Sequence, residues 1–176
     1  NAYEAKGLLS AAIEAKEPVI FLMDFGISSQ KDLVPIESSN IPINKAQIAR
    51  SGQDLTIITF GAQVKNSCSA AESLKNELGL EIEVINLRTL VPLDKKTIIQ
   101  SVRKTQKVLI IEEAIEAYSL SAYISCLIQE SCYGFIKQPI KRLTLPNNCS
   151  FFTDRAIINK NKIIKVIESF QLKPAK

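Results

Sequence analysis

The sequence contains no histidine and no tryptophan. Without histidine a serine–histidine catalytic pair cannot form, so hydrolases of that type are excluded. The 4 cysteines are far apart, and none has the Cys-x-x-Cys spacing that is typical of zinc sites. We therefore predict no metal site and expect reduced thiols in a cytoplasmic protein. The cysteines are Cys68, Cys126, Cys132 and Cys149.

Long apolar runs and clustered charge are also missing. No run approaches the roughly 18 apolar residues that a membrane-spanning helix needs, and residues 1–10 lack the pattern of a secretory signal. The net charge is +4, but the lysines are dispersed rather than gathered in a basic stripe with interleaved aromatics. We therefore expect neither membrane nor nucleic-acid binding. Because the sequence opens inside a helical pattern, we expect it to be a piece of a longer chain.

The sequence does contain an alternation of two hydrophobic patterns. Short runs rich in β-branched residues predict strands, at residues 55–60, 82–87, 108–111 and 140–145. Apolar residues three and four positions apart predict helices, around residues 64–78, 98–102, 120–128 and 163–170. Asp94 is placed to cap the second of these helices.

Strands that alternate with helices over short connections are typical of a doubly wound α/β fold. We predict a sheet of about five strands, mostly parallel, with helices on both faces. Residues 45–50 alternate more than the other runs and precede a turn-like Ser-Gly-Gln-Asp segment. This pattern predicts one antiparallel edge strand, which we expect to form a hairpin with residues 55–60.

The residues before position 45 follow a different pattern. Residues 3–15 have one apolar side and predict a helix, which Pro18 ends, and residues 19–23 predict a strand. Residues 25–44 contain two prolines, four serines and no periodicity. A connection of that length usually marks a boundary or a functional segment. We therefore predict a linker at 25–44 and a domain at 45–176.

Several strings then resemble one known family. Residues 42–61, PINKAQIARSGQDLTIITFG, resemble PIGKAxVxRxGxDxTIVTYG, and residues 83–94, EVINLRTLVPLD, are similar to EVIDLRTLxPLD. Residues 4–13 and 18–22 look like DAKGLLxAAI and NPVxFLE, and the match continues in register at 107–113 and 140–143. The family is that of the beta subunits of the thiamine-diphosphate-dependent decarboxylating component of pyruvate and branched-chain 2-oxo-acid dehydrogenases. Its members carry a domain of the transketolase C-terminal superfamily.

The resemblance implies which parts of the enzyme this chain contains and which parts lie upstream or in a partner subunit. Residues 1–24 would be the last helix and strand of an upstream pyrimidine-binding domain, and residues 45–176 a transketolase-like C-terminal domain. The glutamate that activates the cofactor would lie upstream, and the diphosphate-binding motif in a partner alpha subunit. The expected partners are the alpha subunit, a second beta subunit and the acyltransferase core of the complex. Thiamine diphosphate and magnesium would belong to the parent heterotetramer, and this chain alone would neither bind them nor catalyse the reaction.

The sequence departs from the family strings in four places. Asn44 replaces the glycine of PIGK at a position where a positive φ is expected, and asparagine tolerates that conformation best after glycine. Asn86 replaces the aspartate of IDLRT, and Met23 replaces the glutamate of FLE. The glycine-rich turn that follows Glu112 and Glu113 in the family is here a stretch without glycine.

Five residues are the site candidates. Arg88 follows a strand at the edge where open α/β sheets bind ligands, so it either approaches a substrate or satisfies loop carbonyls. Glu112 and Glu113 could act as acid and base, but one of them is more simply a helix cap or a contact with a partner chain. Tyr118 and Tyr123 are core or interface aromatics. No catalytic residue is predicted.

Three functions stay open at this point. The chain is part of a 2-oxo-acid dehydrogenase subunit, a diverged interaction module without catalysis, or the C-terminal domain of a deoxyxylulose-phosphate synthase or a transketolase. The upstream sequence would discriminate among them. In each case the apolar residues of the first helix and strand need a cover, either the rest of the chain or a second copy. An unpaired strand edge favours a homodimer.

Overall fold

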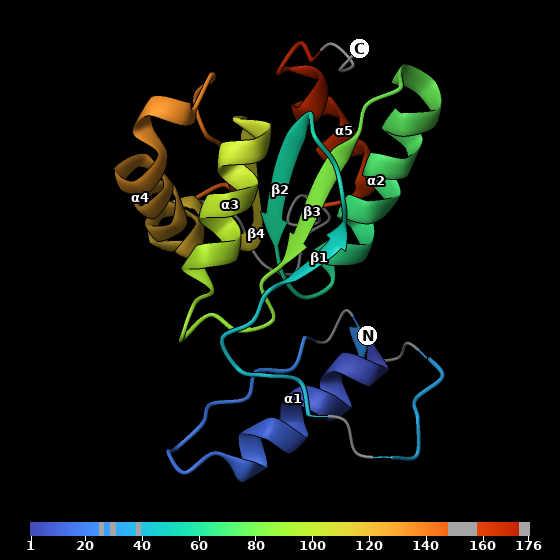
Figure 1. Ribbon diagram of the computed structural model, residues 1–176. Coiled ribbons are helices and arrows are strands. Elements are labelled where there is room, and N and C mark those ends of the chain that lie inside the picture. The colour runs from blue at the N-terminus through green and yellow to red at the C-terminus, as the bar shows by residue number, and fades with distance from the viewer. Residues whose placement is uncertain (25–26, 29–30, 38–39, 148–157, 173–176) are drawn as a thin grey trace.

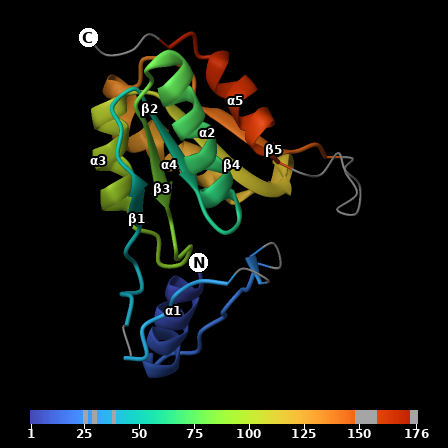
Figure 2. The same cartoon turned by 90° about the vertical axis from the view of Figure 1, so that its right-hand side faces the viewer.

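The computed structural model describes residues 1–24, 27–28, 31–37, 40–147 and 158–172. They form two parts, an α/β domain from Lys45 onward and a smaller N-terminal part that lies beneath it in Figure 1. The described residues of the smaller part, before Lys45, are called the arm below. Figure 2 shows the same arrangement from the side, with the arm under the ends toward which the parallel strands run.

The domain is built on one five-stranded sheet in the order β1-β3-β2-β4-β5. β1 runs antiparallel to β3, and the remaining neighbours are parallel. This confirms the predicted doubly wound sheet with one antiparallel edge strand. The strands are β1 (Gln47–Arg50), β2 (Leu55–Thr59), β3 (Ile82–Asn86), β4 (Val108–Ile115) and β5 (Lys141–Leu145).

The predicted hairpin between β1 and β2 is wrong, because β3 lies between them. The turn after β1 crosses the start of β3, where the amide nitrogens of Gln53 and Asp54 both donate to the carbonyl of Glu81, at 2.7 and 2.9 Å. Gly52 makes this crossing possible. A side chain there would overlap the backbone of Ile82 and Glu83. A turn does follow β1, as predicted, but the two strands that it connects are not neighbours in the sheet.

Four helices cover the two faces of the sheet, as predicted (Figure 1). α2 (Gln63–Leu78) and α5 (Lys160–Glu168) pack on one face, and α3 (Lys95–Thr105) and α4 (Leu120–Cys132) on the other. Each face has its own core, because successive side chains of the strands point to opposite sides. Leu55 and Ile57 face the first pair of helices, and Ile58 and Ile85 face the second. All four of these side chains are completely buried.

The arm begins with α1 (Ala2–Glu14), which confirms the predicted first helix. Asn1 and Glu4 form a capping box at its start, with the Glu4 amide donating to Asn1 Oδ1 at 2.8 Å. The later part of the arm folds back on the helix. The Lys6 ammonium donates to the carbonyls of Pro35, Ile36 and Glu37 at 2.6, 2.9 and 3.1 Å.

Residues 19–23 do not form the predicted strand. Their side chains are exposed, with 87% of Ile20 and 80% of Leu22 accessible to solvent. A strand needs a neighbour for its backbone hydrogen bonds, and the sheet of the domain offers no place beside the arm. The prediction of a strand at residues 19–23 is therefore wrong for the described structure.

Candidate functional site

The site candidates gather at the carboxyl ends of the parallel strands. From β2 the chain moves through α2 to β3 on one side, and from β3 it returns through α3 to β4 on the other side of β2. The connections therefore leave β2 and β4 in opposite directions, which is the arrangement that creates a ligand crevice in open α/β sheets. The arm lies beneath this edge (Figure 2).

Arg88 leaves the end of β3 in a left-handed backbone conformation, with φ 58°. Asn86 Oδ1 accepts a hydrogen bond from the Arg88 amide at 3.2 Å, which stabilises the tight turn. The guanidinium Nε then donates to Glu4 Oε1 at 2.7 Å. The Asn86 side-chain amide donates to both carboxylate oxygens of Glu4, at 3.1 and 3.3 Å.

This geometry bears on the two interpretations of Arg88. Its guanidinium is held by a carboxylate of its own chain, and both side chains are mostly buried, with 14% and 11% accessible. The alternative in which Arg88 satisfies loop carbonyls was therefore too simple, because the partner is a glutamate 84 positions away. The proximity of Arg88 to a substrate stays a prediction.

The residues that follow Arg88 also hold the incoming chain. The Thr89 hydroxyl accepts from the amide of Asn44 at 3.1 Å, and Asp94 Oδ2 accepts from the amide of Ala46 at 3.1 Å. Asn44 has φ 73°, as expected for a residue that replaces glycine in a left-handed position. Thr89 and Asp94, both in the LRTLVPLD string, thus hold the backbone of residues 44–46 at the start of the domain by hydrogen bonds.

Asp94 has a second role as the predicted cap of α3, which is confirmed. Its Oδ1 accepts from the amide of Thr97 at 3.1 Å, and its Oδ2 accepts from the Thr97 hydroxyl at 2.7 Å. Burial raises the pKa of Asp94, but the hydrogen bonds from Thr97 and Ala46 and the charge of Lys45 outweigh it, so the pKa lies below its usual value. The carboxylate is therefore ionised at neutral pH, as a cap should be.

Glu112 and Glu113, at the end of β4, have different surroundings. Glu112 accepts from the amides of Leu120 and Ser121 at 3.1 and 2.7 Å, so it is the expected cap of the next helix. Glu113 points to the opposite face, where Gln63 and the backbone of Ile158 donate to it. Burial raises the pKa of Glu113, and the nearby charge of Asp24 raises it further, against these hydrogen bonds. The two carboxylates therefore make separate contacts on opposite faces of the sheet.

Asp24 is a residue that sequence reasoning missed. Its Oδ2 accepts from the amide of Ala62 at 2.6 Å, at the start of α2. A negative charge there is stabilised by the unpaired amides and the dipole of the helix. The contact joins residues 38 positions apart, and no local pattern around Asp24 signals it.

Tyr118 and Tyr123 are both exposed, so the core alternative is wrong for them. Tyr118 belongs to the 3-10 turn Glu116–Tyr118, and Tyr123 lies on α4 with the ammonium of Lys95 6.0 Å from its ring centre. The exposed positions suit an interface, which stays a prediction.

The described residues do not fit a magnesium–diphosphate site. They bring together no group of three or more His, Cys, Asp or Glu side chains that could hold a metal. Three carboxylates at the carboxyl edge of the sheet have partners within the chain, Glu4 with Arg88, Asp24 with Ala62 and Glu112 with the first amides of α4. We therefore derive no reaction step through thiamine diphosphate for this chain.

The cysteines within the described residues are free thiols. Burial raises the pKa of Cys68, and the hydrogen bond to Glu130 raises the pKa of Cys126. Both are therefore protonated at neutral pH and are poor nucleophiles. Cys149 lies outside the described residues.

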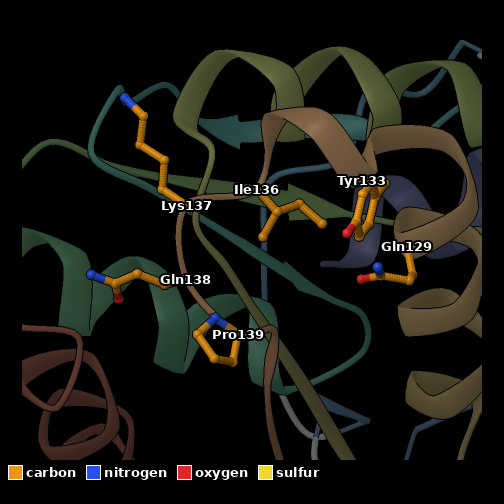
Figure 3. A pocket seen from close by; sticks show the side chains of 6 residues that line it. All are labelled: Gln129, Tyr133, Ile136, Lys137, Gln138 and Pro139. Carbon is orange, nitrogen blue, oxygen red and sulfur yellow. The ribbon is translucent and has the colours of Figure 1, made fainter.

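A shallow cavity of about 300 Å³ lies at the other edge of the sheet (Figure 3). It is formed by the end of α4 and the segment before β5, far from the strand ends that carry the site candidates. Its lining residues are Gln129, Tyr133, Ile136, Lys137, Gln138 and Pro139.

None of the described helices is long and apolar enough to cross a membrane.

The comparisons with known proteins fit this geometry. The family model "Transketolase, C-terminal domain" matches residues 44–163, which include the whole sheet and all helices of the domain up to α5. The chain belongs to the transketolase C-terminal domain family. Its match begins at Asn44, the residue that Thr89 fastens at the entry to the domain.

The curated relatives of this transketolase C-terminal domain are beta subunits. The beta subunit of acetoin:2,6-dichlorophenolindophenol oxidoreductase from Bacillus subtilis is 37% identical over 99% of this chain and 52% of its own length. The mitochondrial 2-oxoisovalerate dehydrogenase beta subunit of Dictyostelium discoideum is 42% identical over 80% of this chain and 38% of its own length. The beta subunit of the pyruvate dehydrogenase E1 component of Staphylococcus aureus is 36% identical over 93% and 51%. The chain spans about half the length of these relatives or less.

Among solved structures, an inactive beta4 tetramer of a split-gene transketolase has a TM-score of 0.63 at 17% identity, over 74% of this chain and 42% of that one. At that identity the likeness shows the fold alone. It agrees with the α/β fold described above.

One departure from the family strings becomes clear in this transketolase C-terminal domain. Where the family has a glycine-rich turn, β4 continues to Ile115, and a 3-10 turn leads into α4. Arg142 on β5 ties this turn down, donating to the Glu116 carbonyl at 3.1 Å and to the Ser119 hydroxyl at 3.3 Å.

Proposed function

We propose that this chain is the C-terminal part of the beta subunit of a thiamine-diphosphate-dependent 2-oxo-acid dehydrogenase, of the pyruvate dehydrogenase type, and that it works in the cytoplasm. The observation that carries the proposal is the match to beta subunits, at 37% identity over 99% of the chain in one case. In this proposal residues 1–24 complete an upstream domain, 25–44 connect, and 45–176 assemble with the alpha subunit, a second beta subunit and the acyltransferase core.

The proposal assigns no catalysis to the chain alone. Glu4 and Glu112 at the carboxyl edge serve as an ion-pair partner and a helix cap, and the described residues gather no group of three or more His, Cys, Asp or Glu that could hold magnesium. Glu112, Glu113, Tyr118 and Tyr123 lie at or beside the end of β4, where we propose contacts with partner subunits. The free thiols support a reducing compartment.

The chain by itself should associate. Large apolar side chains of the arm are exposed, including Ile13, Ile20 and Leu22, and burying each would contribute roughly 1.5–3 kcal/mol. We propose that two copies cover these residues mutually as a homodimer. Solution scattering of the 176-residue chain tests this, and a monomer at high concentration contradicts it.

The activity test uses the parent beta subunit, produced together with its alpha partner. Decarboxylation should be measured with pyruvate and branched-chain 2-oxo acids, and oxidative cleavage of acetoin should be measured in parallel, with 2,6-dichlorophenolindophenol as electron acceptor in each case. Acetoin is included because one relative is named for it. Turnover of none of these by an assembled heterotetramer contradicts the proposal. Titration calorimetry of the isolated chain with thiamine diphosphate and magnesium should show no binding, and micromolar affinity would contradict that part.

A further inference from the structure

The attachment of the arm to the domain differs from the packing inside the domain. Both apolar cores are built from residues at or after Ala46, and neither includes a side chain of the arm. Three polar contacts instead join the arm to the carboxyl edge, namely Glu4 with Asn86 and Arg88, Asp24 with Ala62, and Asn44 with Thr89. The first of these includes an ion pair, Glu4 with Arg88, of which 11% and 14% of the side chains are accessible.

We propose that Glu4, Asn86 and Arg88 form an electrostatic clasp that fixes α1 against the carboxyl edge of the sheet, so that Arg88 acts as a positioning residue. The clasp rests on contacts within this chain and is independent of the proposed decarboxylase role. It predicts that the arm opens when one of these side chains is replaced, while the domain stays folded.

Each member of the clasp is held in place before the contact forms. The capping box with Asn1 orients Glu4 in the first turn of α1. The Asn86 side chain accepts from the Arg88 amide and thereby aims the arginine away from β3. A contact between side chains that are already oriented loses little conformational entropy on closing. Because both side chains are mostly buried, solvent screens the pair less than a surface ion pair.

The identity of Asn86 is essential to this arrangement. Its amide nitrogen donates to both oxygens of Glu4, while its oxygen accepts from Arg88. An aspartate, which stands here in the family string, could accept but not donate. It would place a second carboxylate beside Glu4 and compete for Arg88. The clasp therefore requires an amide at this position.

The state of the clasp can be read from α1 itself. The helix has 13 residues, and isolated helices shorter than about 12–15 residues are marginal in water. Once released from the carboxyl edge, α1 should fray. Hydrogen exchange of the amides of residues 5–14, followed by mass spectrometry, therefore reports opening of the arm. The amides of β2 and β4 in the same sample report whether the domain remains folded.

The experiment compares wild type with Arg88→Met, Glu4→Gln, Asn86→Asp and the double variant Glu4→Gln/Arg88→Met. Each single variant should speed exchange in α1 on the order of 10- to 100-fold, as expected for the loss of a hydrogen bond to a charged group. The double variant should exchange no faster than the faster single variant, because both changes remove one interaction.

Arg103→Met is the matched control, because Arg103 is an exposed arginine of α3 that donates to the Ser131 carbonyl away from the arm. It should leave exchange in α1 unchanged. If Arg88→Met disturbs the domain, Glu4→Gln still decides the matter, since it changes only the arm. Exchange in α1 within twofold of wild type in Glu4→Gln overturns the proposal, and so does strict additivity in the double variant.

Discussion

The α/β domain and the arm use the same kinds of apolar residue in opposite ways. In the domain, Ile57 and Ile85 are completely buried between strands and helices, whereas in the arm Ile20 and Ile36 are almost fully exposed. The domain finds its packing partners within this chain, and the arm is joined to it by polar contacts. The comparison teaches that the described residues of the domain bury their apolar side chains against one another, whereas much of the apolar surface of the arm has no cover among the described residues.

The strongest way to test this comparison is to remove one apolar side chain from each region. Ile57→Ala should lower the free energy of unfolding by about 2–5 kcal/mol, because it leaves a cavity between the sheet and α2. Ile20→Ala should change it by less than about 0.5 kcal/mol. Urea unfolding followed by circular dichroism measures both. Equal losses in the two variants would mean that the arm is packed as tightly as the domain.

Gly52→Ala tests the crossing of β3 by the turn before β2. An added Cβ meets the backbone of Ile82 and Glu83, which cannot move without breaking the sheet. We expect a loss of about 1–3 kcal/mol or more in the free energy of unfolding. Gly134→Ala, where nothing lies within 4 Å of the new Cβ, is the control and should be neutral. A stable Gly52→Ala variant would contradict the described path of the chain.

These same elements show how much of the fold and of the candidate site could be predicted from the sequence. The strands and helices of the domain were predicted because apolar periodicity reports burial on each face. The strand that pairs with β1 was predicted wrongly, because Gly52 indicates a turn but does not indicate which strand the turn crosses. Glu4 and Asp24 also escaped prediction, since their contacts lie 84 and 38 positions away. Local patterns cannot show which distant backbone or side chain meets a lone carboxylate.

Asp94→Ala sharpens the comparison at the boundary of the two regions, where Asp94 caps α3 and holds Ala46. The loss in the free energy of unfolding at neutral pH should be about 0.5–2 kcal/mol. Because the pKa of Asp94 is lowered in the folded state, its contribution is present above the unfolded pKa and is lost as the pH falls through the folded pKa. The difference from wild type should therefore shrink in acid. Asp32→Ala, in the exposed arm, should have no measurable effect at either pH.

Glu113→Gln should change the free energy of unfolding least of all these variants, and it should raise that free energy rather than lower it. Burial raises the pKa of Glu113, so its ionised form destabilises the folded state above that pKa, and this cost is absent below the unfolded pKa. The variant should be slightly more stable than wild type at neutral pH, with a difference that vanishes in acid. Glu112→Gln is the matched control. It should be destabilising, because it removes one acceptor from the amides at the start of α4.

The order of the strands also constrains how the chain can fold during synthesis. β1 and β2 follow one another in sequence, but each meets β3 rather than the other. No local hairpin can form while only they have left the ribosome, and β2 would emerge with both of its edges open. The first stable pairing has to wait until Asn86 is available at the end of β3. Such non-local pairing is slow and exposes strand edges to other chains. Nascent chains that end before Asn86 should therefore need a chaperone.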